Sequence, residues 1–389
     1  MPARAELRHP ADSPQTLLAL AREREPEMLL RLQRLVEIES PSNDKAAVDR
    51  AAEFVARWAA KIGGEVRQHR QKHFGDSLEI RFGTRRRGEA PLLLLGHLDT
   101  VWECGTLARM PWRLTKERIC GPGVFDMKAG VVMALAALAI RRESGALATP
   151  VTLLLHGDEE IGSPASRQLT ERIARQCRAV YVLEPAQGAD GAYKTARKGV
   201  GVFRLDVDGV AAHSGLDPRR GRSAIVELAH QIDALGQAAD PAREITINVG
   251  VIGGGTRSNV VAAHAWAEID ARVPRTRDQR HVERVLRGLR PRDKDCTLRL
   301  SGEWNRPPME RTPAAAALFR RAQVFASELG FALEEASVGG GSDGNFTSAL
   351  GVPTLDGMGA VGAGAHAVDE HCLRRHLVPR MALVAAMLS

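Results

Sequence analysis

An apolar run that opens into a histidine is the feature that most constrains this chain. Four leucines at residues 92–95 are followed by Gly96, His97 and, two residues later, Asp99. Such a run, broken by glycine, predicts a strand buried on both faces, as in a parallel sheet. In open parallel sheets, ligands collect beyond the carboxyl ends of the strands, so we expect His97 at a functional edge.

Three later segments repeat this arrangement of an apolar run or glycine turn next to acidic residues. The glycine turn at residues 121–130 carries Asp126, and the apolar run at 179–183 ends in Glu184. The run at 151–156 leads to Asp158, Glu159 and Glu160. These three adjacent acids either cap the next helix or supply a metal ligand with a base beside it, and the residues alone leave both interpretations open.

Two histidines and three carboxylates are thus predicted at one edge of one sheet. They are His97, Asp126, Glu160, Glu184 and His366. These ligand types suit a pair of zinc ions that share one carboxylate. Asp99 lies on the same side of the extended segment as His97, where its carboxylate can orient the ring and leave the other nitrogen for a metal.

The length and the change of pattern along the chain predict two domains. A chain of 389 residues is too long for one ordinary core. Residues 1–198 and 308–389 read as a doubly wound α/β domain with a mostly parallel sheet, the predicted zinc-binding catalytic domain. Residues 199–307 alternate like antiparallel strands around helices, which predicts an inserted α+β domain.

Charge and cysteine content narrow the partners and the compartment. The formal charge of +7 is spread over scattered arginines, which favours a small anionic substrate or simple solubility over nucleic acid. The five cysteines include no CxxC pair, so neither a disulfide framework nor a thiolate zinc site is indicated. Residues 1–39 lack the apolar core of a signal peptide and no run approaches membrane-spanning length, so we expect a cytoplasmic protein without membrane contact.

At these residues the sequence resembles the zinc-dependent aminoacylase and carboxypeptidase family, which includes bacterial glutamate carboxypeptidases, acetylornithine deacetylases and succinyl-diaminopimelate desuccinylases. The resemblance runs from about residue 25 to the end and rests on the motifs GHLDTV, GPGVFDMKAG, DEEIGS, LEP, GVAAHSG, SNVV and GGGSD. It implies that His97, Asp126 and Glu184 hold one zinc ion and that Asp126, Glu160 and His366 hold the other. Co²⁺ or Mn²⁺ could replace zinc. Glu159 would be the general base, and Asp99 the orienting partner of His97.

The resemblance also implies a homodimer and a carboxylate-binding site. The inserted domain would be a lid that pairs with a second subunit, where His213 would steady the oxyanion. Asn259 and Arg272 match positions that hold the substrate's carboxylate, Arg306 is similar to a third basic contact, and Gly340 could offer its backbone N–H. Arg257 replaces a small residue of the family pattern, which points to a preferred substrate side chain other than glutamate.

The expected function is hydrolysis of the amide bond next to a C-terminal amino acid with a free carboxylate, in a peptide or an N-acyl amino acid. The motif match is closest to the glutamate carboxypeptidase type. Two alternatives stay open. One is an N-acyl amino acid deacylase or deacetylase, and the other is a metal-containing binding protein without turnover, against which the intact Glu159 argues.

Overall fold

The computed structural model describes residues 13–84, 88–145 and 147–389 of the chain. This part of the chain divides into two compact units. The larger unit contains the described residues of Met1–Thr195, with Arg311–Ser337 and Ser342–Ser389, and the smaller unit contains Ala196–Glu310 and Val338–Gly341. Residues 1–12, which belong to the predicted catalytic domain and to the segment without a signal-peptide pattern, lie outside the described residues. The predicted domain limits at 198 and 307 stay predictions.

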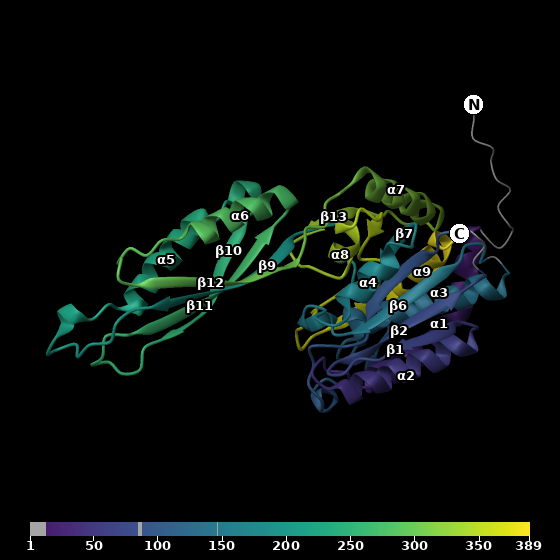
Figure 1. Cartoon of the computed structure of the whole chain (residues 1–389). Helices are drawn as coiled ribbons and strands as arrows, with labels where there is room; N and C mark the ends of the chain where they lie inside the picture. Colours follow the sequence, from purple (N-terminus) through teal and green to yellow (C-terminus); the bar gives the residue numbers. More distant parts are fainter. Residues whose placement is uncertain (1–12, 85–87, 146) are drawn as a thin grey trace. The chain divides into compact units, whose positions relative to one another are not determined.

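A six-stranded sheet forms the centre of the larger unit (Figure 1). Its order is β1 (Glu65–His69), β2 (Gly75–Phe82), β6 (Val151–Gly157), β3 (Leu92–His97), β7 (Ala179–Val182) and β14 (Thr354–Leu355). Strand β3 pairs in parallel with β6 and β7, and β14 pairs in parallel with β7. Strand β2 is antiparallel to β1 and β6. This parallel-rich sheet, with the separate antiparallel sheet of the smaller unit, confirms the predicted fold class.

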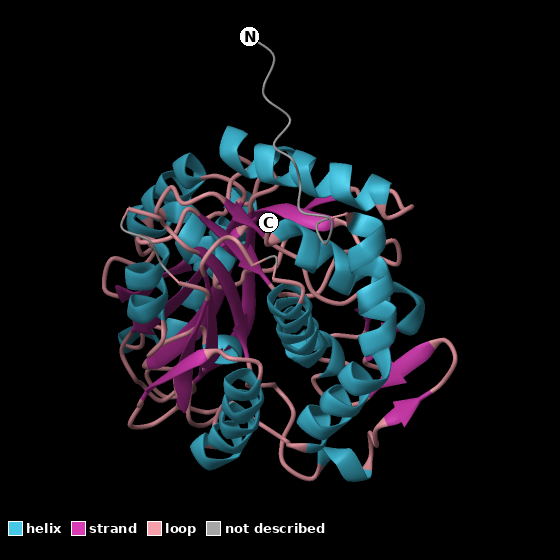
Figure 2. Ribbon diagram, turned by 90° about the vertical axis from the view of Figure 1, so that its right-hand side faces the viewer, coloured by secondary structure: helices cyan, strands magenta, loops and turns pink. Residues whose placement is uncertain are grey.

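The leucine run of β3 is buried because helices cover both faces of the sheet (Figure 2). Leu92 and Leu94 belong to the core on one face, and Leu93 and Leu95 belong to the core on the other face. The first core is built with α1 (Pro14–Glu37), α2 (Lys45–Lys61), α3 (Ala129–Glu143), α7 (Pro313–Glu328) and α9 (Arg374–Met387). The second is covered by α4 (Arg167–Ala174), and α8 (Gly344–Ala349) lies against α4. Alternate side chains of one strand therefore stabilise two cores.

Local sequence explains where three of these helices begin. Ser13 accepts a hydrogen bond from the backbone N–H of Thr16, Asp44 accepts one from Ala47, and the Thr312 side chain caps α7 in the same way. Side-chain oxygens at this position satisfy backbone N–H groups that the first turn leaves without partners.

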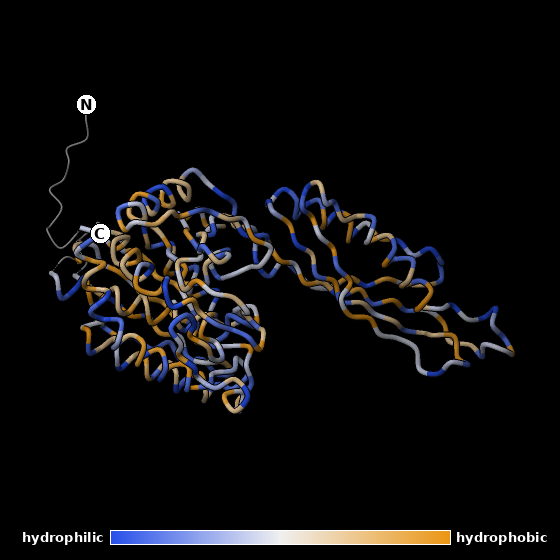
Figure 3. Tube along the Cα trace, turned by 180° about the vertical axis from the view of Figure 1, so that it is seen from behind, coloured by the Kyte–Doolittle hydropathy of each residue, from blue (hydrophilic) through white to orange (hydrophobic). Residues whose placement is uncertain are grey.

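The smaller unit is an antiparallel sheet with two helices. Its strand order is β10 (Thr246–Gly254), β11 (His264–Val273), β9 (Gly199–Asp208) and β12 (Thr297–Arg306). Every second residue of β9 and β11 is buried, and these residues pack with α5 (Ala224–Ala238) and α6 (Thr276–Gly288). Hydrophobic and hydrophilic segments accordingly alternate along its strands (Figure 3). The alternation of apolar and polar residues predicted from the sequence arises because helices cover only one face of this sheet.

A second sheet in the larger unit joins two distant loops. Its order is β15 (Gly362–Ala363), β16 (His371–Leu373), β5 (Arg118–Cys120) and β4 (Arg113–Leu114). Strands β15 and β16 flank His366, and β5 leads into the glycine turn that carries Asp126. The antiparallel pairing of β16 with β5 therefore brings these two loops together.

The remaining elements are short. Strands β8 (Tyr193–Arg197) and β13 (Glu335–Val338) pair with each other. The short helical turns are η2 (Thr106–Ala108), η3 (Val124–Lys128), η4 (Glu159–Ile161), η5 (Pro218–Arg220) and η6 (Pro241–Arg243). Among the described residues, no helix has the length and apolar character needed to cross a bilayer, and the five cysteines form no disulfide.

Candidate metal centre

The five predicted metal ligands lie together at one edge of the larger unit's sheet. His97 ends β3, Glu160 lies in η4 directly after β6, and Glu184 follows β7 by two residues. Asp126 lies in η3, and His366 lies in the loop between β15 and β16. Three of the ligands thus come from neighbouring parallel strands, which end at the same edge.

Asp126 lies between the two histidines. Its Oδ1 is 3.3 Å from His97 Nε2, and its Oδ2 is 3.5 Å from His366 Nε2. Glu184 Oε1 is 3.6 Å from His97 Nε2, and Glu160 Oε2 is 3.1 Å from His366 Nε2. Each histidine therefore faces one oxygen of Asp126 and one further carboxylate, which is the pairing expected of two ions with a shared ligand.

Ligand atoms of two three-residue groups lie within 4.8 Å of one another. One group is His97, Asp126 and Glu160, and the other is His97, Glu159 and Glu184. These groups differ from the ion-pair pattern because Glu160 also approaches His97. The shorter distances, 3.1–3.6 Å, pair His97 with Asp126 and Glu184 and pair His366 with Asp126 and Glu160. The second group shows that the predicted base Glu159 lies beside the ligands.

Several ligand atoms in this cluster are buried without a satisfactory partner. His97 Nε2, Asp126 Oδ1 and Glu160 Oε1 have no hydrogen-bond partner among the described residues. His97 Nε2 lies 3.3 Å from Asp126 Oδ1 and 3.6 Å from Glu184 Oε1, and both distances exceed the roughly 2.7–2.9 Å of a charge-assisted hydrogen bond. Buried polar atoms are rarely left unsatisfied. Cations bound between the imidazoles and carboxylates would satisfy all three atoms, so the residues fit a metal.

The ionisation of these groups also points to a missing positive charge. Burial lowers the pKa of His97, but its contacts with Asp126, Asp99 and Glu184 bring it well above its usual range. Contacts with Asp126 and Glu160 raise the pKa of His366 to about 10. Burial raises the pKa of Glu160 to about 6, although His366 opposes this. Without a cation, protons on the imidazoles compensate the carboxylates, and a bound metal would displace them.

A backbone carbonyl orients His97, and the Asp99 carboxylate contacts the turn of the predicted base Glu159. His97 Nδ1 donates to the carbonyl oxygen of Asp99 at 2.9 Å, which leaves Nε2 directed to the cluster, whereas Asp99 Oδ1 is 3.5 Å from the ring. The Asp99 carboxylate instead accepts the backbone N–H groups of Glu159 and Glu160 at 3.2 and 3.1 Å, and the hydroxyl of Ser42 at 2.7 Å. Asp99 therefore holds the turn that carries the predicted base Glu159 and the predicted ligand Glu160.

Sequence reasoning missed two buried residues. Glu370 accepts hydrogen bonds from the loop that carries Asp126, and Lys128 donates to the carbonyl of Ile38 at 2.8 Å. Burial lowers the pKa of Lys128 to about 8, although the charge of Glu370 opposes this. The spacing of Glu370, four residues after His366, was the only signal in the sequence that could have pointed to it.

The predicted oxyanion and substrate residues belong to the smaller unit. His213 is exposed, and its Nδ1 accepts the backbone N–H groups of Gly215 and Leu216 at 3.2 Å. Ser214 donates its backbone N–H to the carbonyl of Asn259, so His213 and Asn259 lie in neighbouring loops.

The three remaining predicted residues lie in and near the triple-glycine segment of the smaller unit. Arg272 donates to Asp270 at 2.9 Å and to the carbonyl of Gly339 at 2.9 Å. Arg306 is buried, and its side chain lies beside Gly341. The carbonyl of Gly340 accepts a hydrogen bond from the buried Arg197, a residue that the sequence did not single out.

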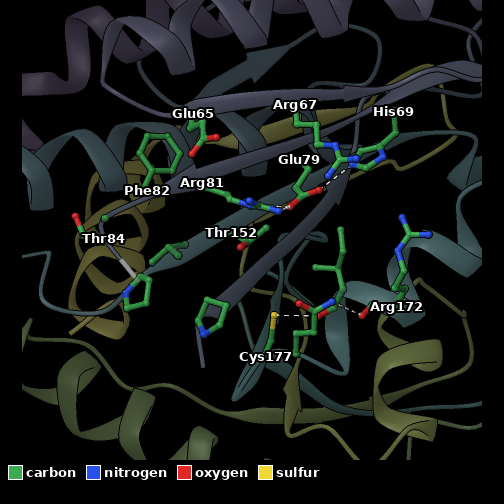
Figure 4. A pocket seen from close by; sticks show the side chains of 16 residues that line it. Glu65, Arg67, His69, Glu79, Arg81, Phe82, Thr84, Thr152, Arg172 and Cys177 are labelled. Atoms are coloured by element: carbon green, nitrogen blue, oxygen red, sulfur yellow. Dashed lines mark hydrogen bonds and ion pairs between the residues drawn. The ribbon is translucent and has the colours of Figure 1, made fainter. Parts of the chain in front are cut away.

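A cavity of about 490 Å³ elsewhere in the larger unit contains none of the predicted site residues (Figure 4). It is lined by residues of β1, β2, the start of β6 and α4. Its buried Glu79 accepts from Arg81 Nε at 2.8 Å and contacts His69 Nε2 at 2.8 Å. The buried carboxylate of Glu79 is already satisfied by contacts with Arg81 and His69, so the cluster at the strand ends is the better candidate for chemistry.

Residues 93–389 match the sequence profile described as Peptidase family M20/M25/M40. The chain belongs to this peptidase family. Carboxypeptidase G2 of Pseudomonas sp. is 27% identical over 378 residues, covering 96% of this chain and 91% of that protein. The family assignment makes the protein a hydrolase of peptide or amide bonds, and it confirms the resemblance drawn from the motifs.

Solved structures of the family share the fold. A tripeptidase from Staphylococcus aureus matches with a TM-score of 0.81 at 20% identity, covering 94% of this chain and 97% of that one. A metallo-carboxypeptidase of the family from Sulfolobus solfataricus matches with a TM-score of 0.71 at 17% identity, covering 93% and 98%. One is described as a tripeptidase and the other as a metallo-carboxypeptidase, so the likeness supports the fold and not the specificity.

Proposed function

We propose that this peptidase is a two-metal enzyme that cleaves the amide bond next to a C-terminal amino acid with a free carboxylate. The observation that carries the proposal is the position of Asp126, with one carboxylate oxygen toward each histidine and with Glu159 beside the cluster. A carboxylate shared in this way is the hallmark of paired metal sites.

Zinc is the metal that we propose for both positions. His97 and Glu184 would hold one ion, Glu160 and His366 would hold the other, and Asp126 would bind both. Imidazole and carboxylate ligands suit zinc, although Co²⁺ and Mn²⁺ accept the same donors. When bound, such a pair polarises the substrate carbonyl and lowers the pKa of water.

Glu159 is the general base in this proposal. It accepts the proton of the attacking water and passes it to the amine nitrogen that leaves. Asp99 supports this role because its carboxylate accepts the backbone N–H of Glu159 and fixes the turn. The neutral form of His213 carries its proton on Nε2, because Nδ1 accepts two backbone N–H groups. His213 can thus donate from Nε2 to a developing oxyanion.

The substrate is a peptide or an N-acyl amino acid whose carboxylate is held by Asn259, Arg272 and Arg306, with the backbone of Gly340. Planar guanidinium groups match a carboxylate with two parallel hydrogen bonds. The relative Carboxypeptidase G2 is named as a carboxypeptidase, which agrees with this choice. We also propose a reducing, cytoplasmic setting, because the five cysteines form no disulfide in the described residues.

A homodimer through the smaller unit is part of the proposal. Strand β10 lies at an edge of its sheet and exposes Val251 and Ile252, which are 49% and 62% accessible. The neighbouring helix α5 exposes Ile225 and Val226. A strand with unpaired backbone groups and an apolar surface beside it favours pairing with a second copy. In such a dimer, His213 would serve the site of the partner subunit.

Hydrolysis by the purified protein tests this proposal. Metal analysis should find two ions per chain, light scattering should find a dimer, and N-acyl amino acids or dipeptides with free carboxylates should be cleaved faster than their amides. Glu159→Gln should lower kcat by about 10²–10⁴-fold with the metal content unchanged. Glu53→Gln, at an exposed position of α2, is the matched control. Full activity of Glu159→Gln, or equal cleavage of carboxylates and amides, would contradict the proposal.

A further inference from the structure

Glu370 connects two of the loops that carry the metal ligands. Its Oε1 accepts the backbone N–H groups of Phe125 and Asp126 at 2.8 and 3.1 Å. Its Oε2 accepts the backbone N–H of Gly123 at 2.9 Å and the indole N–H of Trp102 at 2.7 Å. One carboxylate therefore receives four donors, and one of them is the backbone amide of the shared ligand Asp126.

The other end of this connection is the loop of His366. The backbone N–H of Ala367 donates to the carbonyl of Gly364, and that of Glu370 donates to the carbonyl of Ala367, so two internal hydrogen bonds span the loop from Gly364 to Glu370. His366 has a φ of 62°, a conformation that few residues other than glycine adopt. A loop with such a residue needs anchors on both sides. Glu370 supplies an anchor four residues away, across a sequence separation of 244 residues from Asp126.

Burial makes this role specific to a carboxylate. The side chain of Glu370 is 1% exposed, so water cannot replace its hydrogen bonds. A glutamine would present N–H groups to two of the four donors, which leaves buried donors unsatisfied. An aspartate keeps the charge but is one methylene shorter.

We propose that Glu370 is a positioning residue that sets the distance between the ligands Asp126 and His366. This inference rests on the proposed two-metal function and assigns a residue beyond the five ligands and Glu159. Partners behind the ligands of a metal typically contribute about 10–100-fold to metal affinity or activity. We expect an effect of that size although Glu370 touches neither metal nor substrate.

Metal titration of full-length Glu370→Gln tests the inference. Zinc affinity, measured by competition with a chromophoric chelator, should fall about 10–100-fold. The visible absorption of the Co²⁺ form should change in shape, and kcat should fall more than KM rises. Glu370→Asp should recover part of the affinity. Glu79→Gln is the control, because Glu79 is a buried, hydrogen-bonded carboxylate of the same unit away from the ligands (Figure 4).

The outcomes separate this inference from the proposed function. If the wild-type protein fails to bind two ions, the proposed function fails. If the wild type binds two ions and Glu370→Gln keeps the same affinity and Co²⁺ spectrum, only the positioning role is overturned. An equal loss in Glu79→Gln would also overturn it, because the loss would then follow from general destabilisation. Should Glu370→Gln not fold, unchanged zinc affinity in Glu370→Asp would decide against the role, and a loss of fivefold or more would support it.

Discussion

Two clusters of titratable residues in the larger unit, one around Glu79 and one at the strand ends, differ in how their buried carboxylates are compensated. In the cavity of Figure 4, Glu79 has Arg81 and His69 within 2.8 Å, so its buried charge is satisfied by the protein itself. At the strand ends, three carboxylates meet two histidines, and three buried ligand atoms have no hydrogen-bond partner in the described part of the chain. The comparison teaches that unsatisfied donors and acceptors, more than titratable residues as such, distinguish a metal site from an ion-pair network.

Of the substitutions in the two clusters, Asp126→Asn should have the largest effect on metal content and activity. An amide cannot share two anionic oxygens between two ions, so we expect loss of at least one ion and a loss of activity beyond the roughly 10–100-fold that supporting residues cause. Mass spectrometry of the native protein measures the metal content, and initial rates measure kcat/KM. Glu79→Gln in the other cluster should keep both ions. Two tightly bound ions in Asp126→Asn would remove the basis of the comparison.

The second largest expected effect is a dependence of zinc affinity on pH at the strand-end cluster. The pKa of His366 in the metal-free protein is raised to about 10, so below that pH a metal must displace its proton. Apparent zinc affinity should then rise by about tenfold per pH unit between pH 7 and 9. Isothermal titration in buffers of different ionisation heat measures the released proton. Affinity that is flat over this range would mean that no such proton is displaced.

The raised pKa of His366 also predicts that the metal-free protein becomes less stable as the pH rises, whereas its zinc affinity increases. The folded-state pKa of His366 lies above its unfolded value of about 6.5, so its stabilising contribution is fully present below pH 6.5 and is lost as the pH rises toward 10. Half of the His366 side chain is exposed to solvent, which makes this contribution small. Chemical unfolding of the metal-free protein at pH 7 and 9 should show the decrease.

The smallest expected effect is a change in the stability of the protein when the cluster around Glu79 is altered. Replacing Arg81 by methionine leaves buried Glu79 with only His69 and should lower the free energy of unfolding by about 1 kcal/mol, because Arg81 is half exposed. Burial raises the pKa of Glu79, but its bonds to His69 and Arg81 bring it below its usual value. This stabilisation is present above pH 4.5 and is lost as the pH falls, so Arg81→Met should weaken the acid dependence seen in urea unfolding. Zinc affinity should not change, and a tenfold loss would show that the two clusters are coupled.

The positions of the candidate ligands at strand ends could be predicted because they follow from periodicity. His97, Glu160 and Glu184 each come directly after or close to a buried strand, and neighbouring parallel strands place such residues at one edge. The family resemblance added the distribution of these ligands between two ions. The roles of His213, Asn259, Arg272 and Arg306 came from the resemblance, that of Gly340 came from its place in a glycine turn, and all five stay predictions.

The supporting contacts could not be predicted from the same signals. Asp99 follows His97 closely, yet the carbonyl and not the carboxylate of Asp99 makes the close contact with the ring. The carboxylate turns to the backbone of Glu159 and Glu160, about sixty residues away. Glu370 belongs to no apolar pattern, because its partners lie some 245 residues earlier in the chain. Contacts of this kind depend on which loops lie side by side in the folded unit, and the spacing of residues in the sequence does not predict that.

The sequence by itself determined the α/β fold class, the membership in the peptidase family and the types of residue at the strand ends, because apolar periodicity and glycine turns act locally. Only the tertiary structure decided that β16 pairs with β5 and so places His366 beside Asp126. It also decided that Glu370 is buried against the Asp126 loop and that Glu79 is neutralised by its neighbours. These outcomes depend on contacts between segments far apart in the chain, which form only when the whole unit has folded.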